Sequence, residues 1–156
     1  MSPWDTPPLH RHARMLVESF RRWTRRDLLG PDTVGLPDSE LARQLYEAPF
    51  VVVSHGIETD PVLNYGNRAA LDRWELDWET FTKTPSRFTA EAPAREERAR
   101  LLEEVTRHGF IANYAGIRIS STGKRFRITE AVVWNLVDSE GKPAGQAATF
   151  DRWEET

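Results

Sequence analysis

Apolar residues recur every three or four positions between Leu9 and Leu29, and arginines occupy the opposite side of the same stretch. This period predicts an amphipathic helix, which Gly30 and Pro31 end. Because its apolar side is wide enough to be a core face, we expect it to pack either on the chain's own domain or on a second subunit. The residues that we name as candidates for a dimer contact are Leu16, Phe20 and Trp23.

The pattern changes after Pro49, where short β-branched runs replace the helical period. The stretches FVVVS and VLNYGN predict two strands joined by a loop at Asp60-Pro61. Short helices are expected at Ser39–Tyr46, after the capping residue Asn67 and around Trp78–Phe81, and a longer charged helix at Ala94–His108, ended by Gly109.

The last third predicts three long strands, FIANYAGIRIS, RFRITEAVVWNLV and AGQAATFDRW, joined by the turns STGK and DSEGKP. Two strands, a helical middle and three strands with short connections predict an α+β domain of the PAS type. We expect a five-stranded antiparallel sheet with helices on one face, plus the N-terminal amphipathic helix. Residues 1–47 would form a helical extension that packs on the domain or on a dimer partner, and residues 48–156 the PAS-like domain.

Three blocks of the sequence resemble the MEKHLA domain family, a PAS-like family with stand-alone bacterial members. They are FVVVSHGIETDPVLNYGNRAALDRWELDWETFTKTPSR, REERARLLEEVTRHGFIANYAGIRISSTGKRFRITEAVVWNLVD and GQAATF, and the resemblance extends from about Leu9 to Trp153. The family is also found at the C-terminus of plant homeodomain-leucine-zipper proteins. The resemblance implies the fold and a role in sensing or regulation, but no DNA-binding role.

Composition narrows the function further. The chain has 156 residues, which favours one domain, and a net charge of −3, which does not favour nucleic acid. No apolar run is long enough for a membrane span or a signal sequence, so a cytoplasmic location is expected. The absence of cysteine excludes disulfides and a cysteinyl flavin adduct.

The loop after the first strand brings Ser54, His55, Glu58 and Asp60 close together in sequence. Ser54 and His55 are adjacent on a strand end, where successive side chains point to opposite faces, so they are not expected to act on each other. We assign no catalytic residue, and we interpret the polar groups as bonds that hold a tight turn.

The four histidines show no spacing typical of a metal site, so no metal is expected. Haem through His55 or His108 is not expected either, because a lone histidine is more often structural. The identity of any cofactor stays open, as does flavin without a cysteine adduct.

Aromatic residues are abundant on the elements that surround the central cavity of a PAS fold. Strand alternation predicts that Phe110, Tyr114 and Arg118 share one face and that Phe126, Ile128, Val132 and Trp134 share another. A solid aromatic core and a ligand pocket stay open as alternatives; in the second, Arg118 would bind a carboxylate or phosphate. The pocket candidates are His55, Tyr65, Asn67, Trp74, Trp78, Phe88, Phe110, Tyr114, Arg118, Phe126 and Trp134.

These observations favour a sensor that binds a small molecule and signals through helix packing, as a homodimer. An enzyme that uses the same cavity is the alternative, with Glu130, His55 or Asp72 as the general base. A protein-interaction module with a filled core is the third hypothesis.

Overall fold

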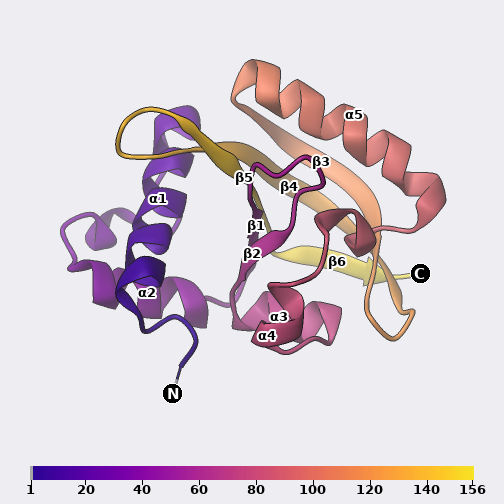
Figure 1. Ribbon diagram of the computed structural model, residues 1–156, viewed down its shortest axis with the longest axis horizontal. Coiled ribbons are helices and arrows are strands. Elements are labelled where there is room, and N and C mark those ends of the chain that lie inside the picture. The colour runs from indigo at the N-terminus through magenta and orange to yellow at the C-terminus, as the bar shows by residue number, and fades with distance from the viewer. Residues whose placement is uncertain (1) are drawn as a thin grey trace.

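The computed structural model describes residues 2–156, apart from the side chains of residues 92–94. Its centre is an antiparallel sheet with the strand order β2-β1-β5-β4-β3, and β6 pairs with β4 (Figure 1). Strands that are neighbours in sequence therefore pair as expected. The pairing of β1 with β5 joins the first two strands to the last ones in a single sheet. The strands are β1 (Val51–His55), β2 (Leu63–Gly66), β3 (Phe110–Ile119), β4 (Arg125–Val137), β5 (Pro143–Phe150) and β6 (Arg152–Glu155).

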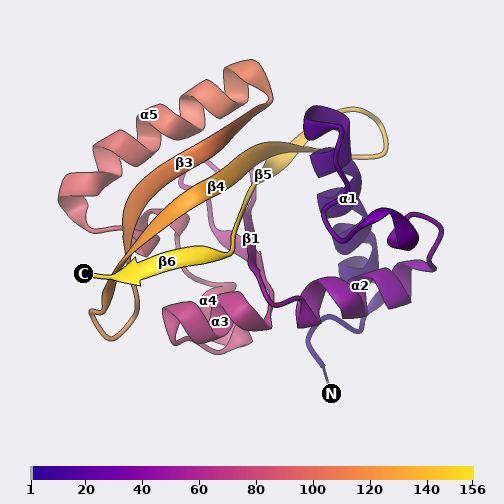
Figure 2. The same cartoon turned by 180° about the vertical axis from the view of Figure 1, so that it is seen from behind.

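Helices lie on both sides of this sheet. The α-helices are α1 (Pro7–Thr24), α2 (Asp38–Glu47), α3 (Arg68–Trp74), α4 (Trp78–Phe81) and α5 (Ala92–His108), with 3₁₀ turns η1 (Pro31–Thr33) and η2 (Ser86–Thr89). Figure 2 shows α1 and α2 on one side and α5 on the other. We call the side that packs on α3 and α5 the cavity face, and the side that packs on α1 the α1 face.

The N-terminal helix is shorter than its sequence pattern predicts. It begins after Thr6, whose hydroxyl accepts a hydrogen bond from the Leu9 N–H, and it ends at Thr24. Arg25 has a left-handed backbone, φ 63°, and its N–H bonds to the Arg21 carbonyl, which closes the last turn before Gly30. The apolar stripe of this helix packs on the sheet of the same chain.

The predicted final strand is divided into β5 and β6 at Asp151. The break lies beside a β-bulge in β4, where Ile128 pairs with Gly116 but Ala131 pairs with Tyr114. Glu130 has φ 55° at this bulge, and Asn113, with φ 58°, lies at a second irregularity in β3. The sheet thus has one more strand segment than predicted, and its two longest strands, β3 and β4, contain register shifts.

These bulges overturn the predicted faces of β3 and β4, because one extra residue reverses the alternation of side chains. Phe126 and Ile128 lie on the cavity face with Trp74, whereas Val132 and Trp134 lie on the α1 face with Phe20. In β3, Phe110 packs with the α1-face cluster, whereas Tyr114 packs with the clusters on the cavity face.

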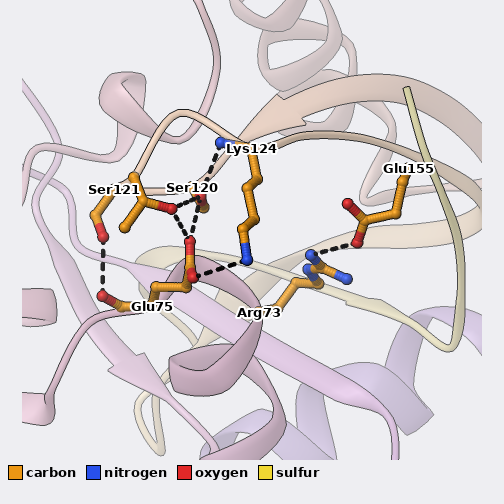
Figure 3. Close-up of polar contacts among 7 residues, drawn as sticks. Arg73, Glu75, Ser120, Ser121, Lys124 and Glu155 are labelled. Carbon is orange, nitrogen blue, oxygen red and sulfur yellow. Dashed lines mark hydrogen bonds and ion pairs between the residues drawn. The ribbon is translucent and has the colours of Figure 1, made fainter.

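The β3–β4 hairpin is fastened to the end of α3 by Glu75 (Figure 3). The Glu75 carboxylate accepts hydrogen bonds from Ser120 Oγ at 2.7 Å and from the Thr122 hydroxyl, and Lys124 Nζ lies 3.4 Å away. Ser121 donates to the Glu75 carbonyl oxygen at 2.8 Å. The hydrogen bonds from the two hydroxyls, followed by Lys124, lower the pKa of Glu75 to about 2.

We expect Glu75→Gln to destabilise this hairpin at neutral pH and to have only a small effect near pH 2, where the carboxyl is about half protonated in the folded state. The folded-state pKa lies below the unfolded value, so the stabilisation is complete above about pH 4.5 and is lost as the pH falls. Hydrogen exchange of the Ser121 amide, which bonds to the Trp74 carbonyl oxygen, measures the effect directly. Glu140→Gln, an exposed residue in the β4–β5 turn, is the matched control; equal exchange in both variants contradicts the assignment.

Candidate ligand cavity

A partly open cavity of about 60 Å³ lies between the cavity face of the sheet, the end of α3 and helix α5. Most of its surface is apolar. The residues that line it are Val53, Ser54, His55, Leu63, Trp74, Thr89, Arg98, Leu101, Leu102, Tyr114, Arg118, Ile128, Val133, Gln146, Ala147, Ala148 and Phe150.

Two buried nitrogen atoms at the cavity have no hydrogen-bond partner among the described residues. They are Nε2 of His55 and Nε1 of Trp74. Buried polar atoms in folded proteins are nearly always bonded, so an orphaned pair at a cavity indicates a place for a bound polar group or water.

The side chains of Ser54 and His55 make their contacts in different directions. His55 lines the cavity, and its Nδ1 lies 3.0 Å from the Gly56 carbonyl oxygen. Ser54 also lines the cavity, but its Oγ lies 2.9 Å from Nε2 of His12 in α1 and donates to Asn64 Oδ1 at 2.5 Å. The two side chains therefore diverge, as the strand pattern predicts.

Only Glu58 forms the expected turn contact, because its carboxylate accepts a hydrogen bond from the Val62 N–H. Asp60 instead pairs with the Arg87 side chain in η2, so the prediction that it bonds the loop backbone is wrong. Burial lowers the pKa of His55, with a smaller lowering from the Arg98 charge, so the ring is neutral at pH 7.

Of the predicted pocket residues, His55, Trp74, Tyr114 and Arg118 line the cavity. Phe126 lies on the cavity face but is buried behind Trp74, with ring centroids 5.3 Å apart. Phe88 is 45% exposed, and the guanidinium groups of Arg87 and Arg95 lie over its ring. These two are therefore not part of the cavity surface.

Four further aromatic candidates belong to the α1 face and do not line the cavity. Trp134 packs edge-on against Phe20 at 5.0 Å, and Tyr65 packs against Trp78 at 5.7 Å. Phe110 pairs with Trp134 across β3 and β4. Prediction placed Phe110 and Trp134 on the wrong face because regular alternation does not anticipate the two bulges.

Asn67 is fully buried and bonded to the backbone on all sides. Its Oδ1 accepts from the N–H groups of Val52 and Ala70, and its Nδ2 donates to the Leu45 and Phe50 carbonyl oxygens. The predicted helix cap is confirmed. With its polar atoms so engaged, Asn67 is not a contact for a ligand.

Among the dimer-helix candidates, Leu16 and Phe20 are buried in the core of their own chain, at 0% and 5% exposure. Trp23 is half-buried, and its Nε1 donates to the Asn135 carbonyl oxygen at 2.9 Å. The apolar side of α1 is therefore occupied within the chain, and its exposed side is mainly charged.

Arg98 and Gln146 are cavity residues that the sequence interpretation missed. Arg98 lies in the charged helix α5, three and four residues before Leu101 and Leu102, which also line the cavity. This helical spacing is the signal that identifies it. Gln146 donates to Asn135 Oδ1 at 3.0 Å and to the Leu102 carbonyl oxygen at 2.9 Å.

The general bases considered in the enzyme hypothesis lie apart from each other. His55 lines the cavity, but Glu130 is exposed and pairs with Arg152, and Asp72 is exposed on α3. Within residues 2–156, no three histidine, aspartate or glutamate side chains that the structure describes cluster in a way that suits a metal ion. His108 is exposed at the end of α5.

Solved structures with the same arrangement identify the class. The PAS domain of a protein from Colwellia psychrerythraea covers 75% of this chain and 94% of its own, with TM-score 0.61 and 10% identity. An RNA-binding light-oxygen-voltage receptor gives TM-score 0.63 and 12% identity over 82% of this chain and 35% of its own. A PAS domain from a two-component sensor histidine kinase gives 0.55 and 15%, over 73% and 91%. The protein has a PAS-like fold.

Its family follows from the sequence match. The chain belongs to the MEKHLA domain family, whose model matches residues 10–155, from α1 to β6. It is 24% identical over 152 residues to the homeobox-leucine zipper protein HOX32 of Oryza sativa subsp. indica, and 25% over 143 residues to ATHB-9 of Arabidopsis thaliana. These matches cover 97% and 90% of this chain but only 18% and 17% of the relatives.

The relatives are therefore much longer than the segment they share with this chain. No helix within residues 2–156 has the length and apolar character needed to cross a bilayer.

Proposed function

We propose that this PAS-like domain is a sensory module that binds a small molecule in the cavity between its sheet and α5. The observation that carries the proposal is a mainly apolar, partly open cavity with unpartnered polar atoms on His55 and Trp74. In a solid core, two buried nitrogen atoms without hydrogen-bond partners lower the stability of the fold, whereas a bound molecule can form hydrogen bonds with both.

The size of the cavity restricts the ligand. Pockets for drug-sized molecules have volumes of about 300–1,000 Å³, and this cavity has about 60 Å³. A flavin or a haem does not fit between these walls unless the sheet and α5 move apart. The proposed ligand is therefore much smaller than either group.

Two series of side-chain contacts connect the cavity with α1 and provide a route for a signal. Gln146 lines the cavity and bonds to Asn135, whose backbone oxygen accepts from Trp23 in α1. Ser54, next to His55 in β1, contacts His12 in α1. A ligand that moves β1 or β5 would change the packing of this helix.

The proposal includes a homodimer in which the accessible, charged side of α1 contacts the second copy. Arg11, Glu18 and Arg21 are exposed residues on that helix, so such a contact would depend on salt. Sedimentation velocity at low and high ionic strength tests this part; a monomer under both conditions overturns the dimer and leaves the cavity proposal to its own test.

Native mass spectrometry of the freshly purified protein, with an absorption spectrum of the same sample, tests the cavity proposal. A small added mass supports it, and denaturing extraction then identifies the molecule. A clean apo mass, together with no thermal shift from a panel of small metabolites, contradicts it.

We expect Ala148→Leu to reduce ligand retention or binding at least about tenfold, because leucine occupies space that Ala148 leaves open on the cavity wall. Ala112→Leu, at an exposed position of β3, is the matched control and retains binding. Circular dichroism shows whether each variant is folded. Undiminished binding by a folded Ala148→Leu protein places the ligand outside the cavity.

A further inference from the structure

Two arginines that face the cavity determine which small molecule suits it. Arg98 comes from α5 and Arg118 from β3, and both are among the lining residues. Arg118 is only 7% exposed. Its guanidinium donates to the Ile117 carbonyl oxygen at 2.9 Å and to the Tyr114 hydroxyl at 3.4 Å, which are neutral acceptors.

Neither arginine forms an ion pair with a carboxylate among the described side chains. The lining residues include no aspartate or glutamate. The pKa of Arg98 is lowered to about 10, first by burial and then by the like charge of Arg118. Other arginines of the protein do have acidic partners, as in Arg87–Asp60, Arg73–Glu155 and Arg125–Glu91.

Two like charges at one cavity are unfavourable unless an anion lies between them. Taking a guanidinium out of water costs free energy that is recovered only through an opposite charge and well-formed hydrogen bonds. Arginine forms such bonds with carboxylates and phosphates, and a carboxylate, which accepts two parallel N–H groups, is the smaller of the two and suits the small cavity. The missing partner at this position is therefore a carboxylate.

His55 adds a second requirement on the ligand. Its Nδ1 lies 3.0 Å from the Gly56 carbonyl oxygen, which accepts a hydrogen bond only if Nδ1 carries the proton. The neutral ring then has an unprotonated Nε2, and this is the buried nitrogen without a partner. Such an atom accepts a hydrogen bond, so the ligand needs a hydroxyl or another donor beside its carboxylate.

The volume sets the length of the ligand. One water molecule needs about 10–15 Å³ of such space, so about 60 Å³ corresponds to about four to six non-hydrogen atoms. The remaining walls, including Leu101, Val133 and Ala148, are apolar and suit a short hydrocarbon part. A fully polar di- or tricarboxylate would leave charges against these walls.

We propose that the cavity binds a short-chain hydroxycarboxylate anion, with its carboxylate on Arg98 and Arg118 and its hydroxyl on Nε2 of His55. This inference rests on the proposed ligand-binding function and names the chemical class of the ligand.

Three probes of nearly equal size test it: lactate, lactamide and propionate. Lactamide keeps the hydroxyl but has no charge, and propionate keeps the charge but has no hydroxyl. Binding is followed by calorimetry and by the NMR signal of the Trp74 indole N–H, which Trp74→Phe identifies. Lactate is expected to bind at least about tenfold more tightly than lactamide and a few-fold more tightly than propionate.

Variants assign the contacts. Arg98→Met and Arg118→Met are each expected to weaken lactate at least about tenfold and to leave lactamide unchanged. Neither is expected to unfold the protein, because each removes a charge that has no carboxylate partner, on buried Arg118 or half-buried Arg98; a higher melting temperature of the ligand-free variant is the expected second result. Arg107→Gln, exposed on α5, is the control that keeps full binding.

The outcomes separate this inference from the function on which it rests. Equal binding of lactate and lactamide, or full lactate binding by both methionine variants, overturns the hydroxycarboxylate assignment while ligand binding stands. The same holds if the purified protein retains a neutral molecule that Ala148→Leu excludes. If none of the probes binds at tens of millimolar and the protein carries no added mass, both proposals fail.

Discussion

Replacing Asn67 by alanine is expected to lower the free energy of unfolding by about 4 kcal/mol. The side chain is fully buried and holds four backbone groups from three segments: the end of α2, strand β1 and the first turn of α3. Loss of the helix cap accounts for about 1 kcal/mol. Each buried group left without a partner adds about 1–3 kcal/mol, less where water enters.

Urea unfolding of the variant and of the wild type measures this difference. Gln44→Ala is the control, because that side chain is only half-buried and its amide makes one hydrogen bond, to Glu40 at 3.3 Å. It is expected to change stability by no more than about 0.5 kcal/mol. A loss below about 1.5 kcal/mol for Asn67→Ala would mean that the four contacts are replaceable by water.

Asn67 also illustrates why the order of elements was predictable. Helix caps, turn glycines and strand periods are local signals, and Asn67, Gly109 and Gly123 stand where the backbone requires them. The same residue shows the limit of such signals. Its position between β2 and α3 is local, but its bonds to Leu45 and Phe50 join segments about twenty residues away, which no pattern within the helix reveals.

The faces of the long strands were not predictable by the same means. An alternating pattern holds only while each residue of one strand has one partner on the next. At Glu130 and Asn113 this pairing shifts, and the side chains beyond them change face. Asparagine tolerates a positive φ and so carries a weak signal, but glutamate carries none. Phe110 and Trp134 were misplaced for this reason.

The sequence left a ligand cavity and a solid aromatic core open as alternatives, and it identified only some of the residues that line the cavity. Arg118 could be assigned to it because its strand position and its charge stand out against apolar neighbours. Arg98 was missed because a helix with many charges indicates solvent exposure, and only its spacing to Leu101 indicates otherwise. His12 was missed for a different reason: its partner Ser54 is 42 residues away, across the interface between α1 and the sheet.

That interface is expected to be sensitive to pH. Lowering the pH from 7 to 4 should reduce the free energy of unfolding by about 3 kcal/mol through His12 alone. Burial lowers the pKa of His12 from 6.5 to about 4, so the unfolded chain takes up the proton first. The stability that this histidine preserves is complete above about pH 6.5 and is lost as the pH falls toward 4.

The contacts of His12 explain why a charge is unfavourable there. Its ring lies 5.8 Å from the ring of Tyr65, and its Nε2 contacts the Ser54 hydroxyl. No carboxylate contributes to the shift of its pKa. The buried Tyr65 hydroxyl, whose own pKa is raised by burial, has no partner among the described residues and offers no negative charge to an imidazolium. Protonation of His12 therefore either breaks the contact between α1 and the sheet or takes place only after that contact has opened.

Urea unfolding at pH 7, 5.5 and 4 isolates this contribution by comparing the wild type with His12→Gln. Glutamine keeps a polar donor near Ser54 but does not titrate, so the loss of stability between pH 7 and 4 should shrink by about 3 kcal/mol. His55, whose pKa is also lowered, and the carboxylates titrate in both proteins and cancel in the difference. His108→Gln, at an exposed position, should retain the wild-type loss. If His12→Gln retains it as well, His12 is hydrated and the contact between α1 and β1 is not the pH-sensitive part of the fold.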